Sequence, residues 1–136
     1  MNRLPVLQRL LLYASFLLLV ATGIAWEALT PGPGAAMLMK IHGAAAMLAL
    51  VLVGTLLVQH VPTGWMSLKN RRSGTLLIGS LGWLAVSGYL LYYAGDESLR
   101  SFASKSHLWI GLTACVIVAL HIRRSAAITY RANARA

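Results

Sequence analysis

Four histidines have the residue type and spacing suited to chemistry, namely His42, His60, His107 and His121. Each residue of a helix turns by about 100°, so the 18 residues from His42 to His60 return the second imidazole to the direction of the first. The 14 residues from His107 to His121 leave those imidazoles about 40° apart. The spacing therefore predicts two helices that each present two imidazoles along one stripe.

An imidazole inside an apolar segment needs a polar partner or a metal, because an unsatisfied polar group costs free energy there. Two nitrogens are too few for a closed zinc site, which takes four ligands. Only Glu27 or methionines are available to complete one pair, and the other pair has nothing comparable. Haem meets the need, because its porphyrin supplies four nitrogens, two histidines complete the iron, and a helix bundle encloses its apolar bulk. The four histidines thus indicate two haem sites.

The elements that position these residues are four long apolar stretches in a chain of 136 residues, 58% of them hydrophobic and 11% charged. A membrane-crossing helix needs roughly 17–25 mainly apolar residues, and all four stretches meet that length, the last at its short end. We predict spans over about residues 10–28, 41–61, 74–94 and 106–122. The expected fold is an all-α integral membrane four-helix bundle forming one transmembrane domain over residues 1–136, with a basic tail over 123–136.

The composition also excludes other classes of protein. A soluble surface needs far more charge, and a disordered chain is poor in apolar residues. A disulfide scaffold is excluded because Cys115 is the only cysteine.

Turn-forming residues separate the stretches. The prolines and glycines at 30–34 should break the chain after the first helix. The segment 61–65, which contains Pro62, is expected to end the second helix. The segment 95–98 is expected to separate the third span from an amphipathic linker over 99–105.

The net charge of +9 predicts the orientation, because cytoplasmic loops of membrane proteins are rich in Lys and Arg. With both termini in the cytoplasm, the basic residues on the inner side are Arg3, Arg9, Lys69, Arg71, Arg72, Arg123, Arg124, Arg131 and Arg135. The charged residues on the outer side are Lys40, Arg100, Lys105, Glu27, Asp96 and Glu97. This asymmetry favours a membrane protein that follows the positive-inside rule over a nucleic-acid-binding protein. It places His42 and His107 near the outer face, and His60 and His121 near the inner face.

Haem propionates are anionic and pair with basic side chains or helix N-termini. Near the outer histidines we therefore expect Lys40, Arg100 and Lys105 to contribute to cofactor binding. The basic residues on the inner side are mostly explained by topology alone.

The 14-residue spacing of His107 and His121 is that of respiratory cytochrome b subunits. From about residue 8 to 123 the chain resembles small four-helix, cytochrome b561-like membrane proteins of bacteria, including a group defined only as a domain of unknown function. The resemblance implies a bacterial inner-membrane location and two haem b groups, the outer ligated by His42 and His107 and the inner by His60 and His121. One departure concerns the inner pair, because the 18-residue separation in the second helix is about 6 Å longer than the 14-residue one.

The function that follows is one-electron transfer across or within the membrane, between a quinone pool or a redox partner protein on one side and an acceptor on the other. The chain would be an electron-transfer protein or an oxidoreductase subunit, since it has no phosphate-binding or dinucleotide fingerprint and no nucleophile–base–acid set. Expected partners are membrane lipid, quinone and a periplasmic or membrane redox protein. The alternative is a non-haem four-helix subunit that anchors a larger complex, with interfacial histidines.

Overall fold

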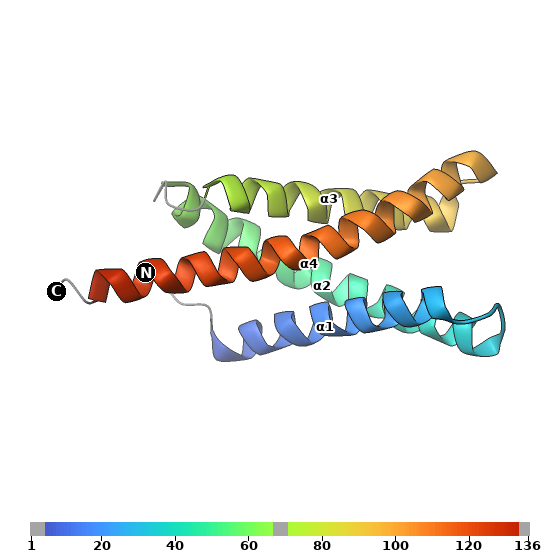
Figure 1. Cartoon of the computed structure of the whole chain (residues 1–136), viewed down its shortest axis with the longest axis horizontal. Helices are drawn as coiled ribbons and strands as arrows, with labels where there is room; N and C mark the ends of the chain where they lie inside the picture. Colours follow the sequence, from blue (N-terminus) through green and yellow to red (C-terminus); the bar gives the residue numbers. More distant parts are fainter. Residues whose placement is uncertain (1–4, 67–70, 134–136) are drawn as a thin grey trace. The chain divides into compact units, whose positions relative to one another are not determined.

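The computed structural model describes residues 5–66 and 71–133, and gives the backbone alone for Gln59 and residues 125–133. The chain folds as four α-helices, whose order Figure 1 shows. They are α1 (Val6–Ala28), α2 (Pro33–Met66), α3 (Arg71–Tyr93) and α4 (Glu97–Asn133). All four are long and apolar enough to cross a membrane. The predicted all-α fold with four transmembrane helices is confirmed.

The chain divides into two units, Met1–His60 and Val61–Ala136. The N-terminal unit is a hairpin of α1 and most of α2. The C-terminal unit holds the last turns of α2 and the hairpin of α3 and α4 (Figure 1). Each unit carries two of the four histidines, and all four lie in helices, as predicted.

The first turn lies where the prolines and glycines predict it. Helix α1 ends at Ala28, and α2 begins at Pro33, where a fixed backbone angle suits the first helical position. The amide of Ala36 donates to the carbonyl of Gly32 at 3.0 Å, which closes the first turn of α2.

The prediction that the segment 61–65 ends the second helix is wrong, because α2 continues through Pro62 to Met66. Proline removes one backbone donor, but its fixed φ is compatible with a helix, and prolines are tolerated inside membrane helices. Arg71, at the start of α3, contacts Trp65 near the end of α2. Its Nε donates to the carbonyl of Trp65 at 2.8 Å, and its guanidinium lies 4.8 Å from the centroid of the Trp65 ring.

The predicted linker over 99–105 is also wrong, because α4 begins at Glu97 and includes it. Asp96 caps this helix: its Oδ1 accepts from the Leu99 amide at 2.7 Å and from the Ser98 hydroxyl at 2.5 Å. These hydrogen bonds, that of Ser98 first, lower the pKa of the Asp96 carboxyl. A capped start explains why the helix begins here rather than at Ser106. At its other end α4 continues to Asn133, so much of the predicted tail is helical.

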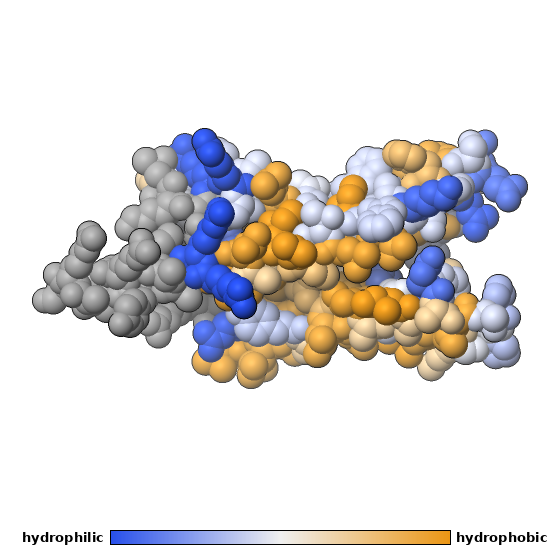
Figure 2. Space-filling model, viewed as in Figure 1, coloured by the Kyte–Doolittle hydropathy of each residue, from blue (hydrophilic) through white to orange (hydrophobic). Residues whose placement is uncertain are grey.

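Small residues fill the contacts inside both units. The buried apolar residues are Ala35, Ala45, Ala49, Ala103 and Ala114. Large apolar side chains are mostly exposed, and Figure 2 shows them over the middle of the helices, with hydrophilic residues gathered near helix ends. Small residues between helices and large apolar ones outside are typical of membrane helices, which meet lipid.

The predicted orientation stays a prediction. Arg3, Lys69 and Arg135 lie outside the described residues, as does the side chain of Arg131.

Candidate functional site

The C-terminal unit holds both of its histidines against serines of α3. The Ser87 hydroxyl oxygen lies 2.8 Å from Nδ1 of His107, and that of Ser73 lies 3.0 Å from Nδ1 of His121. The serines are 14 residues apart on α3 and the histidines 14 apart on α4. The antiparallel helices therefore keep one register over both contacts, and the two imidazoles lie along one side of α4, as predicted.

The N-terminal unit makes the same kind of contact once. The Thr22 hydroxyl oxygen on α1 lies 2.8 Å from Nδ1 of His42 on α2. Fourteen residues before Thr22, Gln8 donates from Nε2 to the Thr55 hydroxyl at 2.6 Å. The two contacts show that α1 and α2 also pair in one antiparallel register. The second contact of this hairpin, however, joins Gln8 to Thr55, whereas the second contact of the C-terminal hairpin joins Ser73 to His121.

The direction of these hydrogen bonds follows from the hydroxyl protons. Thr22 donates its proton to the carbonyl of Leu18 at 2.6 Å, and Ser87 donates to the carbonyl of Trp83 at 2.7 Å. A hydroxyl has one proton, so while that proton is donated to the backbone carbonyl the oxygen can only accept from the imidazole, with Nδ1 as the donor. A neutral imidazole with its proton on Nδ1 has its lone pair on Nε2, the form that ligates a metal through Nε2.

A glycine follows each of the three hydroxyl residues. A Cβ added at Gly23 would lie 3.5 Å from Cε1 of His42, one at Gly88 3.6 Å from Cε1 of His107, and one at Gly74 3.9 Å from Cε1 of His121. The dipeptides Thr22-Gly23, Ser73-Gly74 and Ser87-Gly88 thus combine a hydroxyl in contact with Nδ1 and a glycine that packs beside the ring. We call them hydroxyl–glycine dipeptides.

The hydroxyl partners of the histidines were not predicted from the sequence. A usable signal was present: the hydroxyl residue precedes its histidine by 20 positions in both Thr22–His42 and Ser87–His107.

His60 differs from the other three histidines. It is exposed on α2, and Thr55, five residues before it, lies opposite Gln8. In an antiparallel hairpin His60 therefore lies at a level beyond Val6, the first residue of α1. Residues 5–9, the described residues at this end of α1, contain no Ser, Thr or Gly.

The three basic residues expected near the outer histidines are all exposed, but they lie on different faces. Lys40 and Lys105 each precede a histidine by two residues, which places them about 200° around the helix from it. Arg100 precedes His107 by seven residues and so lies within about 20° of its direction. Arg100 is therefore the one of the three that shares a helix face with an imidazole.

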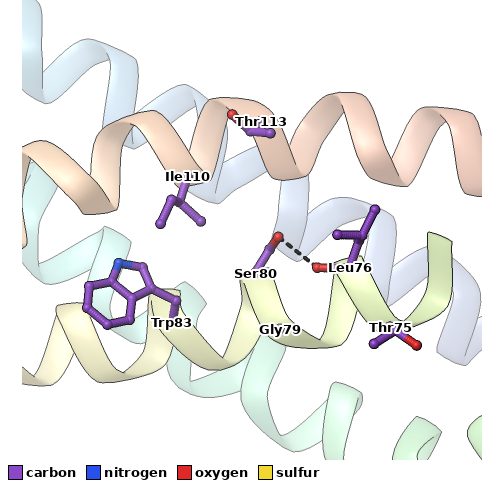
Figure 3. A pocket seen from close by; sticks show the side chains of 7 residues that line it. All are labelled: Thr75, Leu76, Gly79, Ser80, Trp83, Ile110 and Thr113. Carbon is purple, nitrogen blue, oxygen red and sulfur yellow. Dashed lines mark hydrogen bonds between the residues drawn. The ribbon is translucent and has the colours of Figure 1, made fainter. Parts of the chain in front are cut away.

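An open groove of about 340 Å³ lies between α3 and α4, at levels between the two histidines. Figure 3 shows the side chains of Ser80, Trp83 and Ile110 extending into it. Ser80 and Thr113 donate their hydroxyl protons to carbonyls of their own helices, and Trp83 donates from Nε1 to Ser106 at 3.3 Å. The remaining lining residues are Thr75, Leu76 and Gly79.

On the helical wheel the groove residues of α3 lie on the flank opposite Gly74 and Gly88. The groove is therefore separate from the glycine side of the histidine contacts. The thiol of Cys115, between the histidines of α4, donates to the carbonyl of Gly111 at 3.2 Å, which agrees with a packing role.

Among the residues that the structure describes, no group of three or more His, Cys, Asp or Glu side chains could hold a metal ion. A four-ligand zinc site is accordingly not formed by these residues. Comparisons of the chain with protein-family models, with curated proteins and with solved structures gave no match.

Proposed function

We propose that the chain is a di-haem b-type membrane cytochrome that transfers electrons across or within the cytoplasmic membrane. The observation that carries the proposal is the pair His107 and His121 on α4, 14 residues apart, each with Nδ1 on a serine of α3. Ionisable residues inside membrane helices mark functional sites by default. The resemblance to cytochrome b561-like proteins, which includes this histidine spacing, leads to the same proposal.

The residues of the chain fit haem in two respects. First, Nδ1 of His42 and of His107 is engaged by a hydroxyl oxygen at 2.8 Å, which leaves Nε2 of each ring as the nitrogen available to bind iron. Second, the glycine beside each ring provides backbone surface without a side chain, where a flat macrocycle can approach closely. When bound, haem supplies a one-electron iron couple whose potential is tuned by its ligands and their hydrogen bonds.

In this proposal His42 and His107 bind the outer haem, and His60 and His121 bind the inner one. Pairing one histidine from each unit is part of the proposal and rests on the sequence and the resemblance. Arg100 is placed on the helix face of His107 and is the best suited of the three outer basic residues to pair with a propionate. Lys40 and Lys105 would pair with a propionate only if their side chains extended around their helices.

The charges of the C-terminal hairpin support the proposed orientation. Its antiparallel register brings the start of α3, with Arg71 and Arg72, to the same end as Arg123 and Arg124. This end lies near His121, whereas the opposite end carries the acidic start of α4. By the positive-inside rule His121 belongs to the cytoplasmic half, with both termini in the cytoplasm. Electron donors and acceptors would be quinone in the lipid or redox proteins at either face.

The test is a reduced-minus-oxidised visible spectrum of the full chain purified from membranes of cells supplied with haem precursors. We expect b-type bands and a pyridine haemochrome count of two haems per chain. The variant His107→Ala should lose one of them. The matched control is Thr113→Ala on the same helix, whose hydroxyl donates only to the carbonyl of Trp109 in the described contacts. It should keep both.

Absence of b-type bands from the purified wild-type chain would overturn the proposal and favour the non-haem anchoring subunit. A count near one per chain would remove the site formed by His60 and His121. Loss of both haems in His107→Ala would mean that the bundle, rather than one site, had been disrupted.

A further inference from the structure

We propose that Thr22 and Ser87 are positioning residues, which fix the ring nitrogen that His42 and His107 present to a ligand and increase its electron-donating strength. This inference rests on the proposed function for its consequences at iron. Its structural part, the control of the imidazole tautomer, stands on the contacts themselves. Ser73 is placed to do the same for His121.

Both hydroxyls are shielded from the surroundings. Ser87 is completely buried and Thr22 is 5% exposed. In a low-dielectric interior a hydrogen bond is electrostatically stronger than in water, and no water competes for the acceptor. The contacts of 2.8 Å between these oxygens and Nδ1 therefore favour one tautomer and one orientation of each ring, and at His42 the backbone carbonyl of Leu19 accepts a further hydrogen bond.

A serine or threonine in a helix often donates to the carbonyl one turn back, and this alone has no function. Ser80 shows that ordinary behaviour, with its hydroxyl donating to the carbonyl of Leu76 at 2.8 Å. Ser80 lies seven residues from both Ser73 and Ser87, so the three serines share one face of α3. Both Ser80 and Ser87 donate to a carbonyl of α3, but Ser87 also contacts a histidine. Ser80 is therefore a matched control for Ser87.

The chemical consequence follows from proton sharing. A ligating histidine that donates Nδ1–H to an oxygen becomes more basic at Nε2, as for other metal ligands held by outer hydrogen bonds. A more basic ligand stabilises the ferric over the ferrous state, so these hydroxyls should lower the midpoint potential of the haem that they support. Removing them should raise that potential and weaken haem retention, about ten- to a hundredfold by analogy with other metal sites.

The first experiment is a redox titration and a haem-transfer assay on the haem-loaded full chain. Ser87→Ala removes one hydroxyl, and Thr22→Val removes the other while keeping the shape of the side chain. We expect a higher potential for one haem and faster haem loss in both variants. Ser80→Ala and Thr22→Ser, which leave the histidine contacts in place, should match the wild type. Unchanged potentials in Ser87→Ala and Thr22→Val, or an equal change in Ser80→Ala, would overturn the inference.

The second experiment needs no haem. Nitrogen NMR of the imidazole rings in the purified full chain, at about pH 9 where histidine is neutral, reports which nitrogen carries the proton. We expect the Nδ1–H form at His107, and loss of that preference in Ser87→Ala but not in Ser80→Ala. An unchanged tautomer in Ser87→Ala would overturn the inference. If Ser87→Ala changes the tautomer of His107 but the wild-type chain shows no b-type spectrum, the proposed function fails. The inference that the hydroxyl sets the tautomer would still hold.

Discussion

The two helix hairpins are built on the same register but use it differently. In the C-terminal hairpin the contacts Ser87–His107 and Ser73–His121 are 14 residues apart on both helices. In the N-terminal hairpin Thr22 meets His42, and at the corresponding second level Gln8 meets Thr55. The fourth histidine, His60, is displaced further along α2, to a level beyond the start of α1.

This difference shows that the spacing of histidines on one helix does not determine how they are held. In the described contacts, His42, His107 and His121 each have Nδ1 within 3.0 Å of a hydroxyl oxygen on the neighbouring helix and a glycine beside Cε1 of the ring. At the proposed outer haem both ligands are held in this way. At the proposed inner haem His121 is held in this way, and His60 is the more exposed ligand, so the two halves of an electron relay would differ in the exposure of their ligands.

The largest expected effect comes from filling the space beside a held ring. In Gly88→Leu the new Cβ would already touch Cε1 of His107, at 3.6 Å, and the remaining side-chain carbons would displace the ring. We expect loss of the outer haem, measured as a fall from two haems per chain to one. Gly23→Leu, beside His42, should do the same in the other hairpin.

The control is Gly82→Leu on α3, where an added Cβ meets nothing within 4 Å. It should retain two haems. Full haem content in Gly88→Leu would contradict the view that the glycine keeps space for the ring.

The next effect separates the two inner ligands. His60→Ala and His121→Ala should each lose the inner haem, but added imidazole should restore it better in His60→Ala. The reason is exposure: His60 is exposed, whereas His121 is half-buried against Ser73. Titration of each variant with imidazole, followed by its visible spectrum, measures the difference. Two haems in His60→Ala without imidazole would show that His60 is not a ligand.

The fold was largely predictable because membrane helices depend on length and hydropathy, which are local properties of the sequence. The misjudged boundaries had local causes as well. Pro62 was expected to end α2, but in an apolar helix the loss of one donor is tolerated. The segment 99–105 was expected to be an amphipathic linker that leads into the fourth span, but the cap formed by Asp96 starts the helix before it.

The site was predictable only in part. Periodicity correctly placed His107 and His121 on one side of α4, because a helix repeats its direction regularly. The partners Ser87 and Ser73 were missed because they depend on the register of two helices, a long-range property. The same helical geometry places Arg100, seven residues before His107, on the face of that histidine, and Lys105, two residues before it, on another face.

A smaller effect tests whether the polar contact at the second level stabilises the N-terminal hairpin. Thr55→Val removes the hydroxyl that accepts from Gln8 and donates to the carbonyl of Leu52. Hydrogen bonds between membrane helices contribute about 0.6 kcal/mol on average, so we expect a loss of that order in the free energy of unfolding. Equilibrium unfolding in mixed micelles measures it.

Thr113→Val is the matched control in the C-terminal hairpin, since its hydroxyl also donates to a carbonyl of its own helix. Equal destabilisation by Thr55→Val and Thr113→Val would show that the Gln8 contact contributes nothing.

The smallest effect concerns the starts of α2 and α4, which respond differently to acid. The start of α2 is flanked by Gly32, which has no titratable side chain, whereas the start of α4 is capped by Asp96. The pKa of Asp96 is lowered by its hydrogen bonds from Ser98 and then Leu99, so the carboxylate stabilises the folded helix start. That contribution is complete above the ordinary carboxyl pKa and is lost as the pH falls through the lowered value.

We therefore expect the Leu99 amide to lose protection from hydrogen exchange in strong acid, while the amide of Ala36 at the start of α2 keeps its own. Asp96→Ala should remove the Leu99 protection at neutral pH, by roughly three- to tenfold, as for loss of a helix cap. Asp96→Asn keeps an oxygen acceptor without a titratable group, so its protection should be nearly constant with pH. If Asp96→Asn lost protection in acid as the wild type does, the pH response would belong to another group, and the two hairpins would not differ in how their second helices begin.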